Sequence, residues 1–136
     1  YGNKNTGSIG RFETDILVLV TDRGLKIRLS NIEFSKGRAK IKEKSMPLLD
    51  KLARLLNRYV HYRIKVEGHT DDRGSEEFNL RLSENRARAV MEYLISAGIE
   101  KERIFFQGLG ETTPLVPNTS QYNRAKNRIF YFLLIK

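Results

Sequence analysis

The sequence lacks cysteine entirely, contains only two histidines, and has no long apolar run. Without a thiol, the chain cannot form a disulfide scaffold, a thiolate metal site or a cysteine nucleophile. No stretch approaches the roughly 20 consecutive apolar residues that a membrane-spanning helix requires. We therefore expect neither a disulfide-rich scaffold nor a membrane span within this segment, and the lack of cysteine leaves the cellular compartment open.

The composition is typical of one globular domain with a core of modest size. The chain has 136 residues, of which 40% are apolar and 30% are charged. Lysine and arginine total 25 against 16 acidic residues, which gives a net charge of +9. This balance favours acidic partners, namely nucleic acid, anionic lipid or an anionic cell-wall polymer. Because the chain begins at Tyr1 without an initiator methionine, we expect it to be a piece of a longer protein.

The amino-terminal residues differ in composition from the rest of the chain. Residues 1–10 include three glycines and little apolar content, which is typical of a flexible linker. Apolar patterning begins only after Asp15. We therefore expect a linker over residues 1–14 and one folded domain over residues 15–136.

Apolar periodicity predicts several strands and two main helices. The expected strands cover residues 16–20, 25–29, 62–67, 104–106 and 129–135. The expected helices run from Ser45 to about residue 59 and from Ser75 to about residue 97, with a possible short helix over residues 120–126. Helices that lie between strands imply crossovers on one face of a sheet. The predicted fold class is α/β (α+β), a two-layer sandwich of a mixed β-sheet with two main helices on one face.

Local signals predict the ends and the buried faces of these elements. Ser45 and Ser75 are expected to cap the two helices, and Gly98 to end the second. Gly108 and Gly110 are expected to break the strand that begins near residue 104. The first helix is expected to bury a wide stripe of Leu48, Leu52, Leu55 and Tyr59, flanked by Leu49, Ala53 and Leu56. The second helix is expected to bury Leu82, Ala89, Val90, Tyr93 and Leu94.

The last expected strand is more apolar than a half-exposed strand requires. A central position in the sheet would explain this composition, and it is the preferred interpretation. The alternative is that its second face is covered by other parts of a longer protein or contacts another protein.

Residues 36–44 carry a cation at every second position. These cations are Lys36, Arg38, Lys40, Lys42 and Lys44. On an extended segment, the alternation would point all five side chains the same way. Charge runs of this kind usually form a solvated surface, and that is the preferred interpretation. The alternative is a cationic surface that binds an anionic polymer electrostatically.

The sequence offers little support for catalysis, metal binding or nucleic-acid binding. His69 and Asp71 could supply two metal ligands, but no residues at a recognisable spacing complete a set. Adjacent Asp71 and Asp72 are poorly placed to share a proton, and the Gly108-x-Gly110 sequence does not lead directly into a helix as a dinucleotide loop would. The basic residues are spread along the chain without an aromatic-rich strand motif. We therefore expect no enzyme activity, cofactor, metal site or nucleic-acid partner.

The loop and helix over residues 68–90 bring an acidic and a basic side chain near each other. Asp71 follows the end of a strand, and Asn79, Ser83 and Arg86 recur at helical spacing along one flank of the next helix. One interpretation is an internal ion pair between Asp71 and Arg86 that pins the loop. The other is that the two side chains are held apart, each unsatisfied by the other, and bind the ammonium and carboxylate groups of a zwitterion. The residues alone favour neither.

The same segment resembles a known family. The sequences GHTDDRG at residues 68–74 and FNLRLSENRARAV at residues 78–90 closely resemble the signature of the OmpA-like C-terminal domain. This family includes the peptidoglycan-associated lipoprotein and the periplasmic domain of flagellar stator proteins. Further matches are Ile32-x-Phe34, Gly98-Ile99, Arg103-Ile104, Gly108-x-Gly110-Glu111, Pro114 and Asn127-Arg128. The resemblance covers about residues 15–135 and implies the βαβαβ arrangement of that family.

What the resemblance implies is non-covalent binding of peptidoglycan through the zwitterionic end of diaminopimelate in the peptide stem. Asp71 would hold the ammonium group, Arg86 the carboxylate, and Arg128 would add a donor near the carboxylates of the stem. Thr70, Asn79 and Leu82 would line the pocket. Phe34 and Ser35 would lie at its rim.

The chain departs from the family pattern at two positions of this rim. Ser35 stands where the family often has aspartate, and Ile129 follows Arg128 where the family usually has a second arginine. The preferred function is a periplasmic module that anchors an outer-membrane or envelope protein to the cell wall, with the peptide stem as partner and other envelope proteins as further candidates. The alternative is an OmpA-like fold whose weakened or lost pocket leaves it a protein-interaction domain of the envelope.

Overall fold

A computed structural model describes residues 16–136 except residues 23, 31, 113–116 and 121–127. Its strands are β1 (Ile16–Thr21), β2 (Gly24–Leu29), β3 (Arg63–His69), β4 (Ile104–Gly110) and β5 (Phe130–Ile135). Its helices are α1 (Met46–Leu56) and α2 (Glu76–Ser96), with short 3-10 turns at Glu43–Ser45 and Lys101–Arg103. The predicted linker over residues 1–14, and all but the first residue of the possible helix over residues 120–126, lie outside the described residues.

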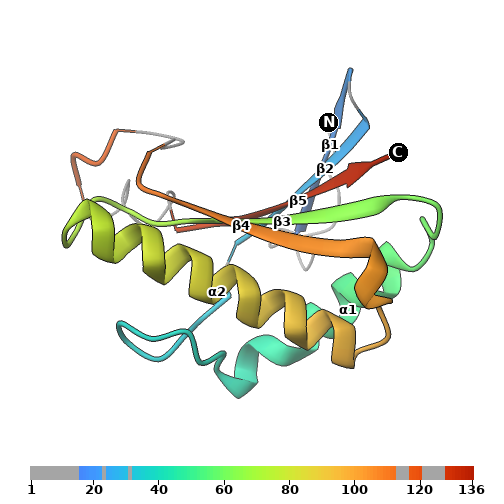
Figure 1. The fold of residues 1–136 in the computed structure, drawn as a ribbon, viewed down its shortest axis with the longest axis horizontal. Coiled ribbons are helices and arrows are strands. Elements are labelled where there is room, and N and C mark those ends of the chain that lie inside the picture. Colours follow the sequence, from blue (N-terminus) through green and yellow to red (C-terminus); the bar gives the residue numbers. More distant parts are fainter. Residues whose placement is uncertain (1–15, 23, 31, 113–116, 121–127) are drawn as a thin grey trace, which may run out of the picture.

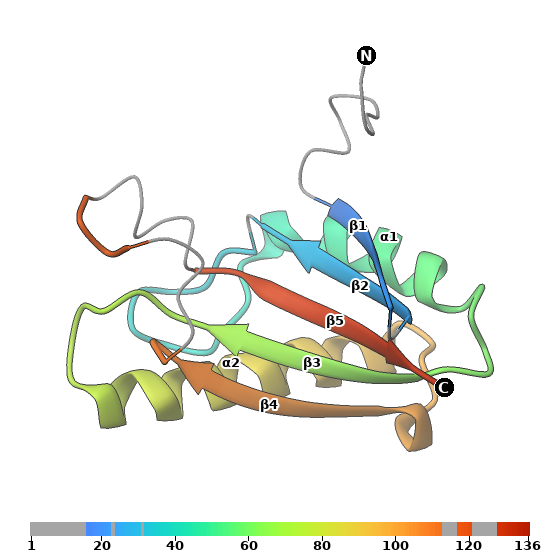
Figure 2. The same ribbon diagram turned by 90° about the horizontal axis from the view of Figure 1, so that it is seen from above.

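The strands form one mixed sheet in the order β1-β2-β5-β3-β4. Strands β3 and β4 are parallel, while the other neighbouring pairs are antiparallel. Both helices lie on the same side of the sheet, below it in Figure 1, and Figure 2 shows the strands above them. The predicted two-layer architecture is therefore confirmed.

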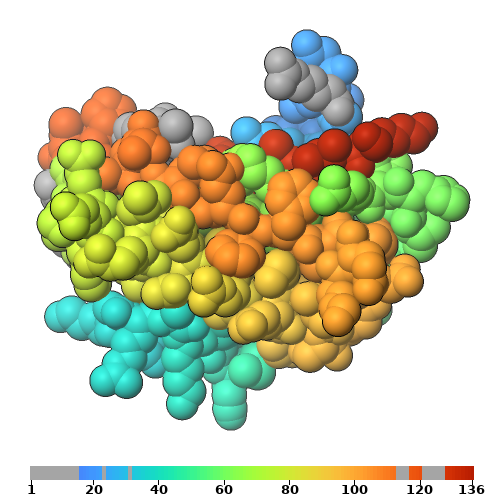
Figure 3. Space-filling model, viewed as in Figure 1, coloured from blue at the N-terminus to red at the C-terminus, as the bar shows by residue number. Residues whose placement is uncertain are grey.

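The position of β5 explains the apolar character of the carboxyl-terminal run. This strand pairs with β2 on one side and β3 on the other, so it lies in the middle of the sheet. Phe130, Phe132 and Leu134 are buried. The preferred interpretation, a central strand, is confirmed. At the edge of the sheet, the β1–β2 hairpin rises above the rest of the surface in Figure 3, and Val20 is 83% exposed.

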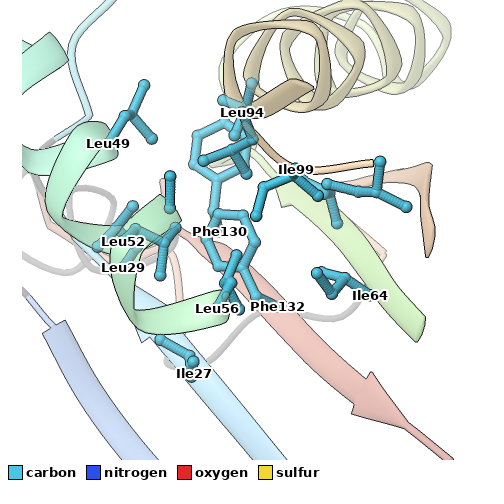
Figure 4. Close-up of a cluster of buried hydrophobic side chains, with 14 of the residues drawn as sticks. Ile27, Leu29, Leu49, Leu52, Leu56, Ile64, Leu94, Ile99, Phe130 and Phe132 are labelled. Atoms are coloured by element: carbon cyan, nitrogen blue, oxygen red, sulfur yellow. The ribbon is translucent and has the colours of Figure 1, made fainter. Parts of the chain in front are cut away.

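The core lies between the sheet and the two helices (Figure 4). The sheet contributes alternate residues of its strands, which are Ile27, Leu29, Ile64, Val66, Phe130, Phe132 and Leu134. The helices contribute Leu49, Leu52, Ala53 and Leu56 from α1 and Ala87, Val90 and Leu94 from α2. This alternation on the strands is the period of two that the sequence predicts.

Helix α1 begins where the sequence predicts, but Ser45 does not cap it. A capping residue has extended backbone angles, whereas Ser45 has helical angles (φ −90°, ψ −12°) because a 3-10 turn runs directly into the helix. The Ser45 hydroxyl instead accepts a hydrogen bond of 2.8 Å from the backbone nitrogen of Glu33. The prediction of a Ser45 cap is therefore wrong, and this side chain ties the segment before the helix to the helix start.

The buried face of α1 lies within the wide stripe that the sequence predicts. The helix ends at Leu56 and buries Leu49, Leu52, Ala53 and Leu56. Leu48, Leu55 and Tyr59 are only partly buried against the core. The residues predicted to flank the stripe are therefore buried more deeply than most of its centre.

Helix α2 has the predicted ends. The Ser75 hydroxyl accepts a hydrogen bond of 3.1 Å from the backbone nitrogen of Phe78, and Gly98 has a φ of +114° just beyond the helix. Its buried residues are Asn79, Ser83, Ala87, Val90 and Leu94. The predicted Val90 and Leu94 are buried, whereas Leu82, Ala89 and Tyr93 are only partly buried. The first half of α2 thus turns polar and small residues toward the sheet.

Glycines in the sheet explain why small residues of α2 are buried. Strand β4 continues through Gly108, so the prediction that this glycine breaks the strand is wrong, whereas the strand does end at Gly110, which has a φ of +56°. A Cβ atom on Gly108 would collide with the backbone nitrogen of Glu84 and lie 2.5 Å from Ser83 Oγ. Ser83 Oγ also accepts a hydrogen bond of 2.9 Å from the nitrogen of Gly110. The glycines therefore let the α2 backbone approach β4 closely.

Substitution of Gly108 by alanine is expected to lower the free energy of unfolding by about 2–3 kcal/mol, because α2 must move away from β4 to admit the methyl group. Urea denaturation measures this change. Gly37→Ala is the matched control, since a Cβ atom there would meet nothing within 4 Å and only its positive φ of +65° adds strain, about 1 kcal/mol. Equal losses in the two variants would contradict the close approach.

The basic segment over residues 36–44 is not extended, so the five cations do not share one direction. The chain reverses between Phe34 and Ile41, which form an isolated antiparallel bridge. The nitrogen of Ser35 donates a hydrogen bond of 3.0 Å to the oxygen of Lys40 across this reversal. All five cations are exposed, as a solvated surface requires.

Candidate ligand-binding cleft

A cleft of about 840 Å³ lies at one end of the sheet. Its walls come from residues 28–37, from the loop after β3, from one flank of α2 and from residues 128–130. Strand β3 ends at this edge, and α2 begins there (Figure 2). Chain segments far apart in the sequence therefore meet around one opening.

The cleft collects seven of the eight residues that the sequence singles out. These are Phe34, Thr70, Asp71, Asn79, Leu82, Arg86 and Arg128. Ser35, the eighth, is not among the lining residues, and its backbone nitrogen donates a hydrogen bond to the oxygen of Lys40 in a tight turn. The lining also contains cations that the sequence interpretation did not include, namely Arg28, Lys36 and Arg73.

Thr70 and Asn79 hold the loop that leaves β3. The nitrogen of Thr70 donates a hydrogen bond of 2.9 Å to the oxygen of Gly110, which extends the sheet pairing by one residue. Asn79 Nδ2 donates to the oxygen of Asp71 at 3.3 Å and to Glu111 Oε1 at 2.9 Å. The buried amide of Asn79 thus fixes the backbone at Asp71 from the helix side.

The hydroxyl of Thr70 is a buried polar atom with no hydrogen-bond partner in the part of the chain that the structure describes. Thr70 is 5% exposed and lines the cleft. Burying a hydroxyl without a partner costs free energy, about 1–3 kcal/mol. A ligand in the cleft that offers a polar group to this oxygen would remove that cost.

The carboxylate of Asp71 is buried and accepts hydrogen bonds on both oxygens. Oδ1 accepts from the nitrogen of Arg73 at 2.9 Å, in the turn geometry that aspartate often adopts two residues before its donor. Oδ2 accepts from the Arg73 guanidinium at 2.9 and 3.2 Å and from Arg128 NH1 at 2.6 Å. Burial raises the pKa of Asp71, but these hydrogen bonds outweigh burial and hold the pKa below its ordinary value. Asp71 is therefore a carboxylate at neutral pH.

The guanidinium of Arg86 is positioned by groups that carry no negative charge. Its Nε donates a hydrogen bond of 2.8 Å to the oxygen of Arg38, and its Cζ lies 4.7 Å from the centre of the Phe34 ring. Phe34 in turn packs against Phe130 at 5.7 Å between ring centres. Among the described residues, no carboxylate forms an ion pair with Arg86.

Electrostatics make Arg86 a ready partner for an anion. Burial and the nearby charge of Arg128 lower the pKa of Arg86, and the charge of Asp71 only partly opposes them. The guanidinium still stays protonated at neutral pH, as arginine does in proteins. A half-buried cation that forms no ion pair gains from an incoming carboxylate, which can accept two parallel hydrogen bonds from it.

The described geometry decides between the two interpretations of Asp71 and Arg86. The structure shows no hydrogen bond or ion pair between these two side chains in its described part, so the internal-pair interpretation is wrong. The picture of two unsatisfied charges is also incomplete. Arg86 lacks a carboxylate, but Asp71 is already bound by Arg73 and Arg128. The sequence did carry one signal for Arg73, because an arginine two residues after an aspartate can reach back to its carboxylate.

Three further features of the sequence interpretation concern Ile129, a metal site and a membrane span. Ile129, at the position of the expected second arginine, is buried and lines the cleft. Within the described ranges, no three histidine, cysteine, aspartate or glutamate side chains cluster in a way that could hold a metal ion. Neither described helix combines the length and hydropathy that would let it cross a bilayer.

Comparisons with known proteins agree on one family. Residues 33–128 match the OmpA family. The chain is 35% identical over 114 residues to the protein described as the probable lipoprotein YiaD of Escherichia coli K12, covering 82% of this chain and 52% of that protein. It is 34% identical over 97 residues to the peptidoglycan-binding protein ArfA of Mycobacterium tuberculosis, covering 71% of this chain and 30% of ArfA.

A solved structure extends this similarity to the fold. The periplasmic domain of Helicobacter pylori MotB matches with a TM-score of 0.83 at 26% identity, covering 97% of this chain and 88% of that one. By contrast, the chain spans about half the length of YiaD and less than a third of ArfA. The shared unit is thus a domain that occurs within longer proteins.

Proposed function

This chain belongs to the OmpA family, and from that membership together with the geometry of the cleft we propose that it binds peptidoglycan non-covalently. The ligand is the zwitterionic end of diaminopimelate in the peptide stem. The observation that carries the proposal is a half-buried guanidinium, Arg86, that faces a cleft without an acidic partner among the described residues. The printed description of ArfA as peptidoglycan-binding supports the same ligand class.

Three groups of the cleft would recognise the ligand. Arg86 binds the carboxylate of diaminopimelate through its two outer nitrogens, since its Nε is held by the oxygen of Arg38. The hydroxyl of Thr70 meets a polar group of the ligand, which satisfies a buried atom. Asp71 accepts the ammonium group. Charge-assisted hydrogen bonds of this kind contribute about 1.5–3 kcal/mol each, so a few of them give a reversible grip.

The ammonium group of the ligand must replace a guanidinium on Asp71. Arg73 is the residue to be replaced, because its side chain is 57% exposed while that of Arg128 is 37% exposed. An exposed guanidinium regains water when it leaves, so the exchange costs little. Arg128 stays in place and keeps the carboxylate ionised.

The proposed setting is the bacterial envelope. The domain would work in the periplasm as part of an outer-membrane or envelope-anchored protein and hold that protein to the cell wall, with other envelope proteins as further partners. It would act as a binding module and not as an enzyme. The periplasmic origin of the MotB domain supports this setting. Many copies along one polymer would add avidity to a weak single contact.

Co-sedimentation with purified diaminopimelate-type sacculi tests the proposal. We expect the domain to pellet with sacculi and to be released by an excess of free muropeptide, because the stem competes for the same cleft. A domain that stays in the supernatant at every sacculus concentration would contradict peptidoglycan binding and favour the alternative, a family member with a lost pocket.

Removal of the Arg73 side chain is expected to strengthen binding. In Arg73→Gln, the ligand no longer competes with the Arg73 guanidinium for Asp71. The dissociation constant for a muropeptide should therefore fall by about two- to fivefold, which corresponds to the free energy of a partly exposed ion pair. Isothermal titration calorimetry measures this change. Arg81→Gln is the matched control, since Arg81 is an exposed cation on α2 outside the cleft. Weaker binding by Arg73→Gln would show that Arg73 contacts the ligand favourably.

A further inference from the structure

One wall of the cleft carries two apolar side chains in line with Arg86. Phe78, Leu82 and Arg86 all line the cleft, and they follow one another four residues apart in α2. Helical residues at this spacing lie on one face, with their Cβ atoms about 5–6 Å apart. An apolar strip therefore continues along the helix from the guanidinium that is proposed to bind the ligand carboxylate.

Phe78 is an exposed aromatic ring in a defined position. It is 44% exposed, although large apolar side chains are usually buried. Its backbone nitrogen donates a hydrogen bond of 3.1 Å to Ser75 Oγ, and a Cβ atom on Gly74 would lie 3.4 Å from Phe78 Cδ2. The ring therefore lies against the loop that follows β3, while part of its surface stays open. An apolar group of a ligand in the cleft can cover that part.

The spacing along α2 indicates which part of a ligand would meet Phe78. Arg86 is the last residue of α2 in the lining, so from there the cleft follows the helix only toward its amino-terminal end. With a rise of about 1.5 Å per residue, Phe78 lies about 12 Å from Arg86 along the axis, and Leu82 lies halfway. An extended peptide covers about 3.3–3.6 Å per residue. A ligand held by its carboxylate at Arg86 would meet Phe78 only with groups beyond its first residue.

We propose that Phe78, together with Leu82, forms an apolar subsite for the aliphatic groups of the peptide stem beyond its zwitterionic end. The inference rests on the proposed function and deepens it, because the cleft then recognises a stem peptide and not a single amino acid. Leu82 packs on the nearer aliphatic groups, and Phe78 packs on those of the following residues. Burial of the exposed part of the Phe78 ring supplies the free energy.

Isothermal titration calorimetry with three ligands tests this inference. The ligands are free diaminopimelate, the stem tripeptide that ends in diaminopimelate, and the same tripeptide joined to its disaccharide. All three carry the zwitterionic end, so they differ in what lies beyond it. We expect the tripeptide to bind the unmodified protein about 3- to 10-fold more tightly than free diaminopimelate, because it covers the Phe78 ring. The disaccharide should add little.

Two alanine variants show whether the preference for the tripeptide comes from Phe78. Phe78→Ala is expected to bind free diaminopimelate as the unmodified protein does, but to lose the preference for the tripeptide. Leu80→Ala is the matched control, because Leu80 is a large apolar residue of the same helix that is 42% exposed and lies outside the lining. This control should keep the full preference. Alanine favours the helix at both positions, so both variants should fold.

The outcomes separate the inference from the proposed function. Equal affinity of the unmodified protein for free diaminopimelate and the tripeptide would overturn the apolar subsite while leaving recognition of the zwitterion intact. The subsite is also overturned if the preference survives in Phe78→Ala, or if this variant loses affinity equally for all three ligands. A loss that appears only with the disaccharide would assign the ring to the sugar and not to the stem. Failure of all three ligands to bind would overturn the proposed function and the subsite together.

Discussion

Arg86→Ala is expected to weaken binding of a diaminopimelate muropeptide by about 10- to 150-fold, the effect of losing charge-assisted hydrogen bonds worth about 1.5–3 kcal/mol. The loss is large because Arg86 has no acidic partner in the described part of the chain, so its charge is available to the ligand. The fraction of the variant that co-sediments with sacculi should fall as the affinity falls. Calorimetric titration and co-sedimentation measure the two effects.

The same substitution should leave the fold intact. Arg86 makes one hydrogen bond to the oxygen of Arg38 and packs on Phe34 at the cleft wall, so its loss is expected to change the free energy of unfolding by less than about 2 kcal/mol. Arg81→Ala, on the exposed side of α2, is the control and should bind normally. Unchanged binding by Arg86→Ala would remove Arg86 from the site.

Asp71→Asn is expected to weaken muropeptide binding by a factor similar to that of Arg86→Ala or larger. The substitution keeps the size of the side chain and its Oδ1 acceptor for the nitrogen of Arg73, but it removes the charge that the ammonium group needs. Two cations, Arg73 and Arg128, then face each other across a neutral group. Calorimetry measures the affinity. For the unmodified protein, it should also show that binding weakens at acidic pH, as Asp71 is protonated.

The pH dependence of stability follows from the same carboxylate. The pKa of Asp71 in the folded protein lies below its ordinary value of 3.8, because the hydrogen bonds from Arg73 and Arg128 outweigh the effect of burial. The stability that these bonds add is therefore fully present above pH 3.8 and is lost as the pH falls through the lowered value. Asp71→Asn should lack this component of acid sensitivity. An identical acid-denaturation profile for Asp71→Asn and the unmodified protein would show that the carboxylate is not held as described.

Much of the fold could be predicted from apolar periodicity and turn chemistry. The alternation in β2 and β3 and the Ser75 and Gly98 signals around α2 are local properties of the chain, and they predict elements to within a few residues. The apolar run at the carboxyl end indicated a central strand, as the pairing of β5 shows. The two-layer arrangement followed from the rule that helices between strands cross over on one face of the sheet.

What could not be predicted depends on packing between distant segments. Ser45 looks like a cap in sequence, yet its hydroxyl is taken by Glu33, twelve residues earlier. Gly108 looks like a strand breaker, yet it lies within β4 and lets the α2 backbone approach the strand closely. The buried Asn79 and Ser83 are polar residues on an inner helix face, which no apolar stripe reveals.

The residues of the candidate site could be predicted, but the hydrogen bonds and ion pairs between them could not. The resemblance named seven residues that line one cleft, because a family motif keeps spacing along the chain. The pairing of Asp71 with Arg73 and the placement of Lys36 at the rim depend on how a turn and a loop fold over the opening. Such contacts leave only weak traces in a single sequence.

The central claim is that the cleft recognises an ammonium and a carboxylate on one amino-acid centre. Calorimetric titration with two muropeptides tests this claim most directly. One contains diaminopimelate, and the other contains lysine in its place. Lysine keeps the ammonium group and lacks the carboxylate. We predict that the diaminopimelate form binds at least about tenfold more tightly, and that Arg86→Ala removes this difference. Equal affinity of the unmodified protein for the two muropeptides would contradict the account.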